Sequence, residues 1–131
     1  MLTVAMANEL LDTDVLIEFL RNKPGAANYI AGLTFPSVSA ITVAELYAGV
    51  RVGKEQIVLD NLVDKLNVID INSDIADIGG LYRRDYGKAH GVGLNDALIA
   101  ATAEIWSKLL VTFNRKHFPM LANVVSPYQR Q

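Results

Sequence analysis

The chain has 131 residues, of which 51% are hydrophobic and 20% are charged, and this balance fits one folded domain rather than a disordered segment. It contains no cysteine, which excludes a disulfide framework and a thiolate metal site. No apolar run approaches the roughly 20 residues that span a bilayer, and no basic region precedes the first apolar residues. We therefore expect a cytoplasmic protein without a membrane segment, with one domain over residues 1–131 and a loose extension at residues 1–7.

Charge is distributed unevenly along the chain, although the net charge is only −2. Residues 1–80 hold five Lys/Arg and eleven Asp/Glu, a net of −6, whereas residues 81–131 hold seven and three, a net of +4. The basic residues of the second part include Arg83, Arg84, Lys88, Lys108, Arg115 and Lys116. A basic surface beside an acidic crevice suits a polyanionic substrate. On charge counts alone, a mixed solvated surface explains the pattern equally well.

The first expected element is a short buried strand that ends at Asp12 and turns into an amphipathic helix from about Val15. Ligands of α/β sheets bind at the carboxyl ends of the strands, so a carboxylate at Asp12 faces a crevice. Asp12, Thr13 and Asp14 are all good helix N-caps. Because one residue is enough for a cap, two carboxylates flanking Thr13 favour a site.

The next elements are a helix from Ala26 to about Leu33, after a breaker cluster at residues 22–25, and a short strand at residues 36–41. Thr42-Val43-Ala44-Glu45 has the form of a capping box, which predicts a helix that opens at Thr42 with Glu45 in its first turn. Helical spacing resumes over residues 56–66.

The second half of the chain continues the alternation of strands and helices. Strands are expected at residues 67–71, 109–112 and 124–125, with a short turn or helical loop at 113–119. Ser73 is the expected N-cap of a helix that ends by Gly87, a polar loop follows, and a helix buried nearly all round begins at Leu94. This order indicates an α/β fold with a mainly parallel central sheet of about four or five strands flanked by helices.

Acidic residues recur at the ends of these elements, at Asp12, Glu45 and Asp96. Taken singly, Glu45 is explained by the capping box and Asp96 by a helix dipole behind an Asn95 cap. Right-handed crossovers between parallel neighbours bring Asp12 and Glu45 to the same sheet edge. Gathered carboxylates repel one another unless a proton or a cation lies between them. Oxygen ligands without Cys or clustered His favour Mg²⁺ or Mn²⁺ over zinc.

Four segments occur in the order seen in PIN-domain proteins: LLDTDVLI at 10–17, SAITVAEL at 39–46, NDALIAAT at 95–102 and LVTFN at 110–114. The chain resembles most closely the VapC-like toxins of bacterial and archaeal toxin–antitoxin pairs. The resemblance implies a PIN-like fold and an Mg²⁺- or Mn²⁺-dependent endoribonuclease that hydrolyses RNA phosphodiester bonds. It also implies a homodimer, inhibited by a small antitoxin whose tail covers the active site.

The resemblance assigns roles by position. It implies that Asp12, Glu45 and Asp96 are metal ligands and catalytic residues, that Asn114 is catalytic, and that Thr13 lies near the metal or the scissile phosphate. Candidates for holding RNA phosphates are the basic residues Arg83, Arg84, Arg115 and Lys116.

The sequence departs from the family pattern at one position. Most members carry a fourth acid three residues after the asparagine, where this chain has His117. One acid of a full two-metal site is therefore missing, and the sequence leaves open whether Asp14 replaces it. His90 and His117 are both typical of surface positions.

Two other functions stay open at this stage. Asp12-Thr13-Asp14 after an apolar strand also resembles the opening motif of haloacid-dehalogenase-type phosphatases, with Asp12 as nucleophile and Asp14 as general acid. That family needs a lysine and a later acidic pair at strand ends, which this sequence does not place well. The other alternative is a catalytically impaired PIN-like binding module.

Overall fold

The computed structural model describes residues 8–130. Five short strands form one sheet in the order β3-β2-β1-β4-β5. Their bounds are β1 Glu9–Leu11, β2 Ser37–Ser39, β3 Asn67–Ile69, β4 Leu109–Val111 and β5 Val124–Val125. Every pair of neighbouring strands is parallel, so all five carboxyl ends lie along the same edge. This confirms the predicted parallel α/β sheet.

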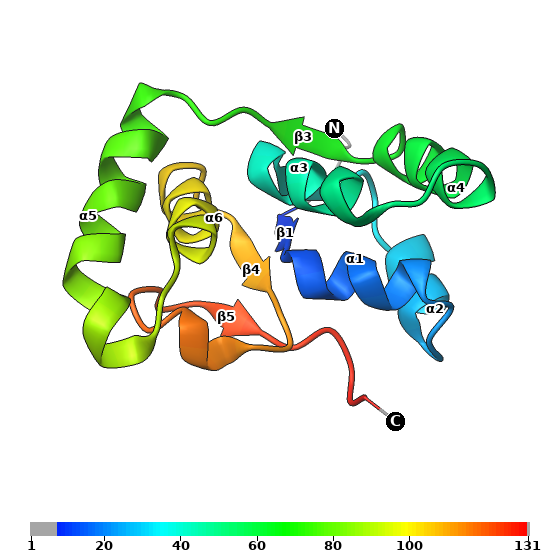
Figure 1. The fold of residues 1–131 in the computed structure, drawn as a ribbon. Coiled ribbons are helices and arrows are strands. Elements are labelled where there is room, and N and C mark those ends of the chain that lie inside the picture. Colours follow the sequence, from blue (N-terminus) through cyan, green and yellow to red (C-terminus); the bar gives the residue numbers. More distant parts are fainter. Residues whose placement is uncertain (1–7, 131) are drawn as a thin grey trace, which may run out of the picture.

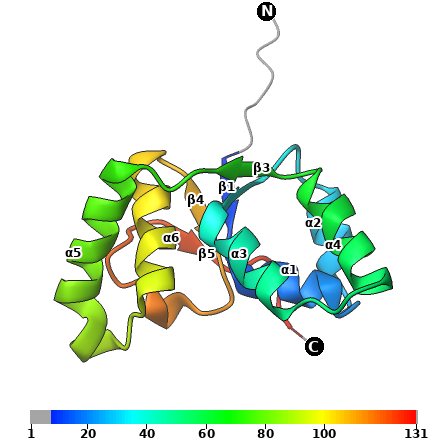
Figure 2. The same ribbon diagram turned by 45° about the horizontal axis from the view of Figure 1, so that its top comes forward.

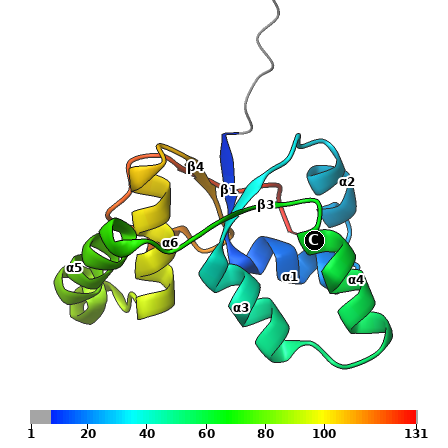
Figure 3. The same cartoon turned by 90° about the horizontal axis from the view of Figure 1, so that it is seen from above.

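Helices cover both faces of this sheet (Figure 1). They are α1 Thr13–Leu20, α2 Ala26–Ala31, α3 Ala40–Gly49, α4 Lys54–Val63, α5 Ser73–His90 and α6 Leu94–Ile105, with a short 3₁₀ turn, η1, at Arg115–His117. Figure 3 shows α5 and α6 on one side of the strands and α1, α2 and α4 on the other. In Figure 2, α3 lies in front of the strands, between the two groups of helices. Within residues 8–130, no helix has the length and apolar character needed to cross a membrane.

Two apolar cores result, one on each face of the sheet. Successive residues of a strand point to opposite faces. Leu10 of β1 and Leu110 of β4 therefore lie in the core under α5 and α6, while Leu11 and Val111 lie in the core under α1, α3 and α4. All four side chains have 0% exposure, as expected for central parallel strands covered on both faces.

Helices α5 and α6 form a closely packed hairpin beside the first core (Figure 1). Gly79 of α5 faces Leu98 of α6, and a Cβ at Gly79 would lie 2.6 Å from Leu98 Cδ2 and 3.3 Å from its Cα. The tight turn between the helices uses Gly91, whose φ of 66° is in the left-handed region and ends α5. The glycine at position 79 is what allows this close approach of the two helices.

The start of α3 differs from the expected capping box. Ser39, at the end of β2, is the N-cap, and its Oγ accepts a hydrogen bond from Ile41 N at 3.2 Å. Thr42 is buried in the first turn and Glu45 lies in the second turn. The Thr42–Glu45 capping box was thus a wrong prediction, because a hydroxyl three residues earlier already caps the helix.

Helices α5 and α6 also start and end differently from the prediction. Asn72 rather than Ser73 caps α5, through a hydrogen bond from Ile75 N at 2.9 Å. Helix α5 continues through Gly87 to His90, since an isolated glycine costs a helix only about 1 kcal/mol relative to alanine and packing against α6 offsets it. Helix α6 is capped at Gly93, so Asn95 lies inside its first turn and its side chain is free for another role.

Candidate active site

Asp12 follows β1 directly and lies at the carboxyl edge of the sheet. Its Oδ1 accepts a hydrogen bond from Thr13 N at 2.8 Å, and its Oδ2 accepts one from Thr112 Oγ1 at 2.7 Å. Leu11 pairs with Val111 in the β1–β4 register, so Asp12 and Thr112 leave neighbouring strands at the same level. Both carboxylate oxygens are thereby oriented, and only 6% of the residue is exposed.

The environment of Asp12 disfavours its ionised form. Burial above all, and then the negative charges of Asp14 and Asp96, raise the pKa of Asp12 from 3.8 to about 7. The hydrogen bonds from Thr112 and Thr13 act in the opposite direction but do not offset the burial. A carboxyl group that titrates near neutral pH beside other acids is typical of a functional site.

Asp14 turns toward the end of β4 and so lies beside Asp12. Its Oδ2 accepts a hydrogen bond from Phe113 N at 3.1 Å and lies 3.2 Å from Thr112 Oγ1. Its Oδ1 is buried and has no hydrogen-bond partner among residues 8–130. Burial raises the pKa of Asp14, and the Phe113 N–H, Thr112 and the charge of Arg130 lower it in part. Asp14 therefore belongs to the same acidic edge as Asp12.

Glu45 reaches this edge from α3. Thr13 Oγ1 lies 2.7 Å from Glu45 Oε1 and 3.0 Å from Thr42 Oγ1, so the Thr13 hydroxyl can donate to the carboxylate. The amide of Asn95 on α6 donates to Glu45 Oε2 at 3.0 Å. The residue after Asp12 thus connects β1 to Glu45, as the expected approach of the two acids requires.

Asp96 reaches the edge from the first turn of α6, where it meets the loop after β4. His117 Nδ1 lies 2.9 Å from Asp96 Oδ2 and 2.9 Å from Asn114 Nδ2. One tautomer of the ring donates to Asp96 and the other accepts from Asn114. Burial raises the pKa of Asp96, His117 lowers it, and the charge of Glu45 raises it. His117 is therefore a direct neighbour of a site acid and not a detached surface residue.

The site acids are thus coupled in charge, although they come from separate helices and strands. In residues 8–130, no three acidic or histidine side chains lie close enough together to bind a metal ion as they stand. Their chemistry nevertheless fits a hard cation: the donors are carboxylate oxygens, and burial, with a smaller contribution from repulsion between the acids, raises the pKa values of Asp12 and Asp96. A divalent cation bound here would relieve that repulsion.

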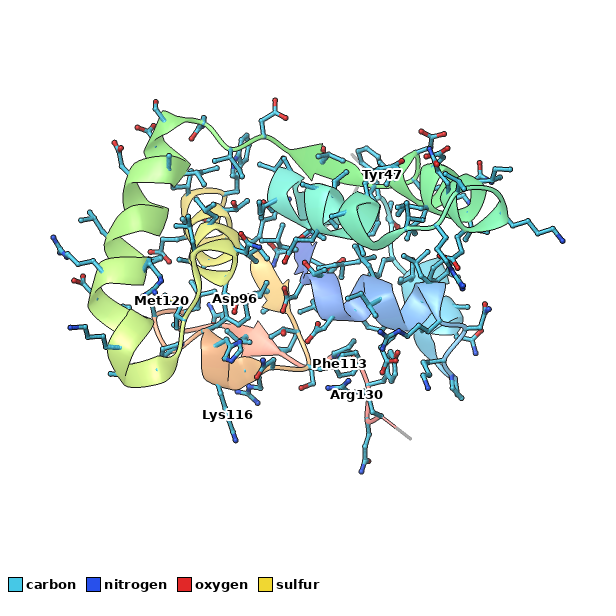
Figure 4. All side chains as sticks on the ribbon, in the orientation of Figure 1. Tyr47, Asp96, Phe113, Lys116, Met120 and Arg130 are labelled. Atoms are coloured by element: carbon cyan, nitrogen blue, oxygen red, sulfur yellow. The ribbon has the colours of Figure 1, made fainter. Side chains whose placement is uncertain are left out.

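The basic candidates divide into two groups. Arg83 and Arg84 lie on the exposed face of α5, where Arg84 pairs with Asp85 at 2.8 Å. Arg115 and Lys116 lie on η1, next to His117, and Figure 4 shows Lys116 extending outward from this turn. The η1 pair is therefore adjacent in sequence to a residue that contacts Asp96, whereas the α5 pair is not.

Sequence reasoning gave no role to two residues that orient the acids. Thr112 binds Asp12 through a hydroxyl, and its Oγ1 also accepts a hydrogen bond from Asn114 N at 2.9 Å. Its position directly after a strand is the same signal that singled out Asp12. Asn95 binds Glu45, and its position beside Asp96 was interpreted only as a helix cap.

Comparison with known proteins agrees with the PIN-domain resemblance of the sequence. A family model described as the PIN domain matches residues 10–123. Ribonuclease VapC19 from Mycobacterium tuberculosis is 36% identical to this chain, over 92% of this chain and 99% of the relative. Ribonuclease VapC10 from the same organism is 33% identical, over 91% of this chain and 92% of the relative. A solved toxin–antitoxin complex from Klebsiella pneumoniae contains a chain with a TM-score of 0.79 and 30% identity, over 92% of this chain and 98% of that chain. VapBC2 from Rickettsia felis, bound to a promoter DNA fragment, gives a TM-score of 0.73 and 27% identity over 90% and 96%.

Proposed function

We propose that this chain, which belongs to the PIN-domain family, is a metal-dependent endoribonuclease and the toxin of a type II toxin–antitoxin pair. The carrying observation is the arrangement of Asp12, Glu45 and Asp96 at one sheet edge, where Thr13 and Asn95, the neighbours of Asp12 and Asp96 in the sequence, both bind Glu45. The ribonuclease relatives support RNA as the substrate. The toxin–antitoxin complexes among the structural neighbours support a small antitoxin as partner. Assembly as a homodimer is part of the same proposal.

Asp12, Glu45 and Asp96 would hold the cation, and Mg²⁺ or Mn²⁺ suits these oxygen donors. When bound, such an ion supplies a water of lowered pKa and neutralises the charge that builds on the scissile phosphate. One of the carboxylates would orient or deprotonate the attacking water.

The surrounding polar residues orient these acids before substrate arrives. Thr112 and the Thr13 backbone N–H fix the two oxygens of Asp12. The Thr13 hydroxyl and Asn95 fix the two oxygens of Glu45. Carboxylates that are already oriented need less reorganisation in the transition state. The side-chain amide of Asn114, beside His117, is the group proposed to contact the phosphate.

The alternatives are less well supported. A phosphatase of the haloacid-dehalogenase type needs Asp14 free to act as a general acid, whereas Asp14 accepts a hydrogen bond from Phe113 N and its other oxygen is buried. A catalytically impaired module would have no need for three acids with oriented oxygens and a titration near neutral pH at Asp12.

Cleavage of single-stranded RNA by the purified protein, free of any partner, tests the proposal. We expect cleavage with Mg²⁺ or Mn²⁺ that stops when a chelator is added. Asp12→Asn is expected to lower the rate more than about 100-fold, because the contribution of a metal-binding carboxylate is several kcal/mol. The matched control is Asp70→Asn: Asp70 also follows a strand of the same sheet, but it is exposed, and the rate should not change.

Two outcomes would contradict this function. A phosphoaspartate trapped at Asp12 would favour the phosphatase. Absence of cleavage with either metal, in a protein that still binds its antitoxin, would favour the impaired module.

A further inference from the structure

We propose that Arg130 binds a phosphate of the RNA substrate, and that Phe113 is the platform that holds its guanidinium beside the acidic edge. This rests on the proposed function, for which it names a substrate contact outside the family motifs. The C-terminal segment, residues 126–130, starts at the carboxyl edge of the sheet and is anchored by Tyr128. Its Arg130 guanidinium is partly exposed and lies near the acids of that edge.

The sheet topology brings the C-terminal segment to the site. Strand β5 runs parallel to β4, so residues that follow Val125 begin at the carboxyl edge. Thr112 N donates a hydrogen bond to Val125 O at 2.9 Å. The segment thus starts next to Thr112, whose hydroxyl binds Asp12 at 2.7 Å.

Tyr128 anchors the segment in place. Its ring meets Phe113 edge-on, with centroids 5.2 Å apart and an interplanar angle of 81°. On its other side it meets Tyr29 of α2 at 6.0 Å and Gly25, where a Cβ would lie 3.4 Å from the Tyr128 ring. Aromatic contacts of this geometry stabilise an arrangement beyond simple area burial. The position of Arg130, two residues later, is therefore determined by packing.

The guanidinium of Arg130 is held in place by its neighbours but stays accessible to a ligand. Its Cζ lies 4.2 Å from the centroid of the Phe113 ring, and Figure 4 shows the two residues together at this end of the molecule. Its Nη1 is 3.6 Å from Glu18 Oε1, a loose ion pair, and 53% of the side chain is exposed. A guanidinium has five N–H donors, so most remain available to a ligand.

The charge around this guanidinium favours an anion of the substrate. RNA must bring phosphates to an edge that carries Asp12, Asp14, Glu45 and Asp96, and those charges repel it. Arg130 stacks on Phe113, whose backbone N–H donates to Asp14 Oδ2 at 3.1 Å, so the guanidinium lies beside this edge. A stacked guanidinium loses little freedom when it binds a phosphate in a forked geometry. Arg130 can therefore offset the repulsion at the point where the backbone enters.

Binding of a labelled single-stranded RNA, in chelator so that it stays intact, tests the proposal for wild type and four variants. Arg130→Ala should weaken binding about 5- to 20-fold, and the slope of log affinity against log salt should fall by about 0.7, the value for one phosphate contact on a single strand. Arg130→Lys should keep the slope with part of the affinity lost. Phe113→Leu should keep the slope and lose affinity, because the charge stays but its platform is removed. Lys65→Ala is the control: Lys65 is exposed in the turn before β3, at the opposite edge of the sheet.

The alternative is that Arg130 only balances Asp14 and Glu18 within the fold. In that case Arg130→Ala lowers the melting temperature while affinity and salt slope match those of Lys65→Ala, and the proposal is overturned. With metal, the proposal also requires Arg130→Ala to raise KM more than it lowers kcat. If wild type cleaves RNA and Arg130→Ala behaves identically, only the inference fails. If wild type neither binds nor cleaves RNA, the inference and the proposed function both fail.

Discussion

On the two faces of the sheet most buried side chains are apolar, whereas those at the carboxyl edge include acids and hydroxyls. The faces hold residues such as Leu10, Leu11, Leu110 and Val111, all without exposure. At the edge, Asp12 and Thr112 are buried to a similar degree. Burial of apolar groups stabilises the fold, whereas burial of a carboxylate raises its pKa and costs free energy when it ionises. The same degree of burial therefore has opposite energetic consequences in the two regions.

This difference indicates that the acids at the carboxyl edge, which are proposed to carry the function, lower the stability of the fold. The two cores can hold the sheet without help from the edge, because the central strands are covered on both sides. Within residues 8–130, no Lys or Arg forms an ion pair with Asp12, Glu45 or Asp96, and His117 is a cationic neighbour of Asp96 when the ring is protonated. Buried carboxylates without such partners are tolerated at a few residues only when the rest of the domain is well packed.

The largest effect that would test this comparison is the pH dependence of stability without metal. The pKa of Asp12 is about 7 in the folded protein and 3.8 ordinarily, so the folded state holds a proton that the unfolded state releases between about pH 4 and pH 7. The free energy of unfolding should therefore fall as pH rises through this window, by up to a few kcal/mol, and level off above about pH 7. Denaturant titrations in chelator at about pH 5 and pH 8 measure it.

Asp12→Asn is the matched comparison, because it removes the titrating group and keeps its shape. The variant should lose less stability than wild type between the two pH values, and it should be the more stable protein at about pH 8. Addition of Mn²⁺ should stabilise wild type and leave Asp12→Asn unchanged. An equal pH dependence in both proteins would mean that Asp12 is not the costly group, and an intact Mn²⁺ shift in the variant would remove Asp12 from the ligand set.

Much of the architecture follows from local patterns. Apolar runs closed by polar residues predict the strands, and the alternation with helices predicts a parallel sheet. The acids Asp12, Glu45 and Asp96 stand out because each is near the end of an element, which is a property of the sequence itself. The helix starts are less predictable: Ser39 and Thr42 are both good caps and both are buried, but Ser39 Oγ accepts from Ile41 N whereas Thr42 Oγ1 contacts Thr13 Oγ1 in the fold.

Contacts between distant segments are what the sequence could not provide. Thr112 binds Asp12 across 100 residues, and this contact depends on β4 being the neighbour of β1. The direction of Asp14 depends on the same pairing, through Phe113 N. Arg130 comes near the site only because β5 lies next to β4 and Tyr128 packs against Phe113. No spacing rule relates these positions.

A second prediction tests the packed side of the comparison, at the α5–α6 hairpin. Gly79→Ala should lower the free energy of unfolding by about 1–3 kcal/mol, because the new methyl group meets Leu98 at a distance that no real Cβ shows. Gly80→Ala is the control on the same helix: nothing lies within 4 Å of its Cβ position, so better helix propensity should stabilise the protein by up to about 1 kcal/mol. Denaturant midpoints measure both. Equal shifts of the same sign would show that the helices do not approach as closely as described.

The smallest expected effect concerns His117, which lies at the carboxyl edge in contact with Asp96. An imidazole cannot replace a carboxylate, so the position next to Asp96 that usually holds an acid carries no negative charge here. Mn²⁺ accepts imidazole more readily than Mg²⁺ does. We expect wild type to prefer Mn²⁺, and His117→Asp to improve Mg²⁺-supported cleavage several-fold by adding a carboxylate beside Asp96. His117→Ala should weaken cleavage with both metals, because Asp96 loses the contact at 2.9 Å.

Cleavage rates across Mg²⁺ and Mn²⁺ titrations separate these effects from a general change in charge. His90→Asp is the control, since His90 ends α5, is exposed, and has Tyr86 rather than a site acid as its ring neighbour. It makes the same substitution away from Asp96, so the metal midpoint should stay at the wild-type value. If His117→Asp instead weakens cleavage with both metals, the imidazole contacts RNA phosphates, and the added carboxylate repels them. Equal rates and midpoints in wild type, His117→Asp and His117→Ala would show that the contact with Asp96 has no part in metal binding or cleavage.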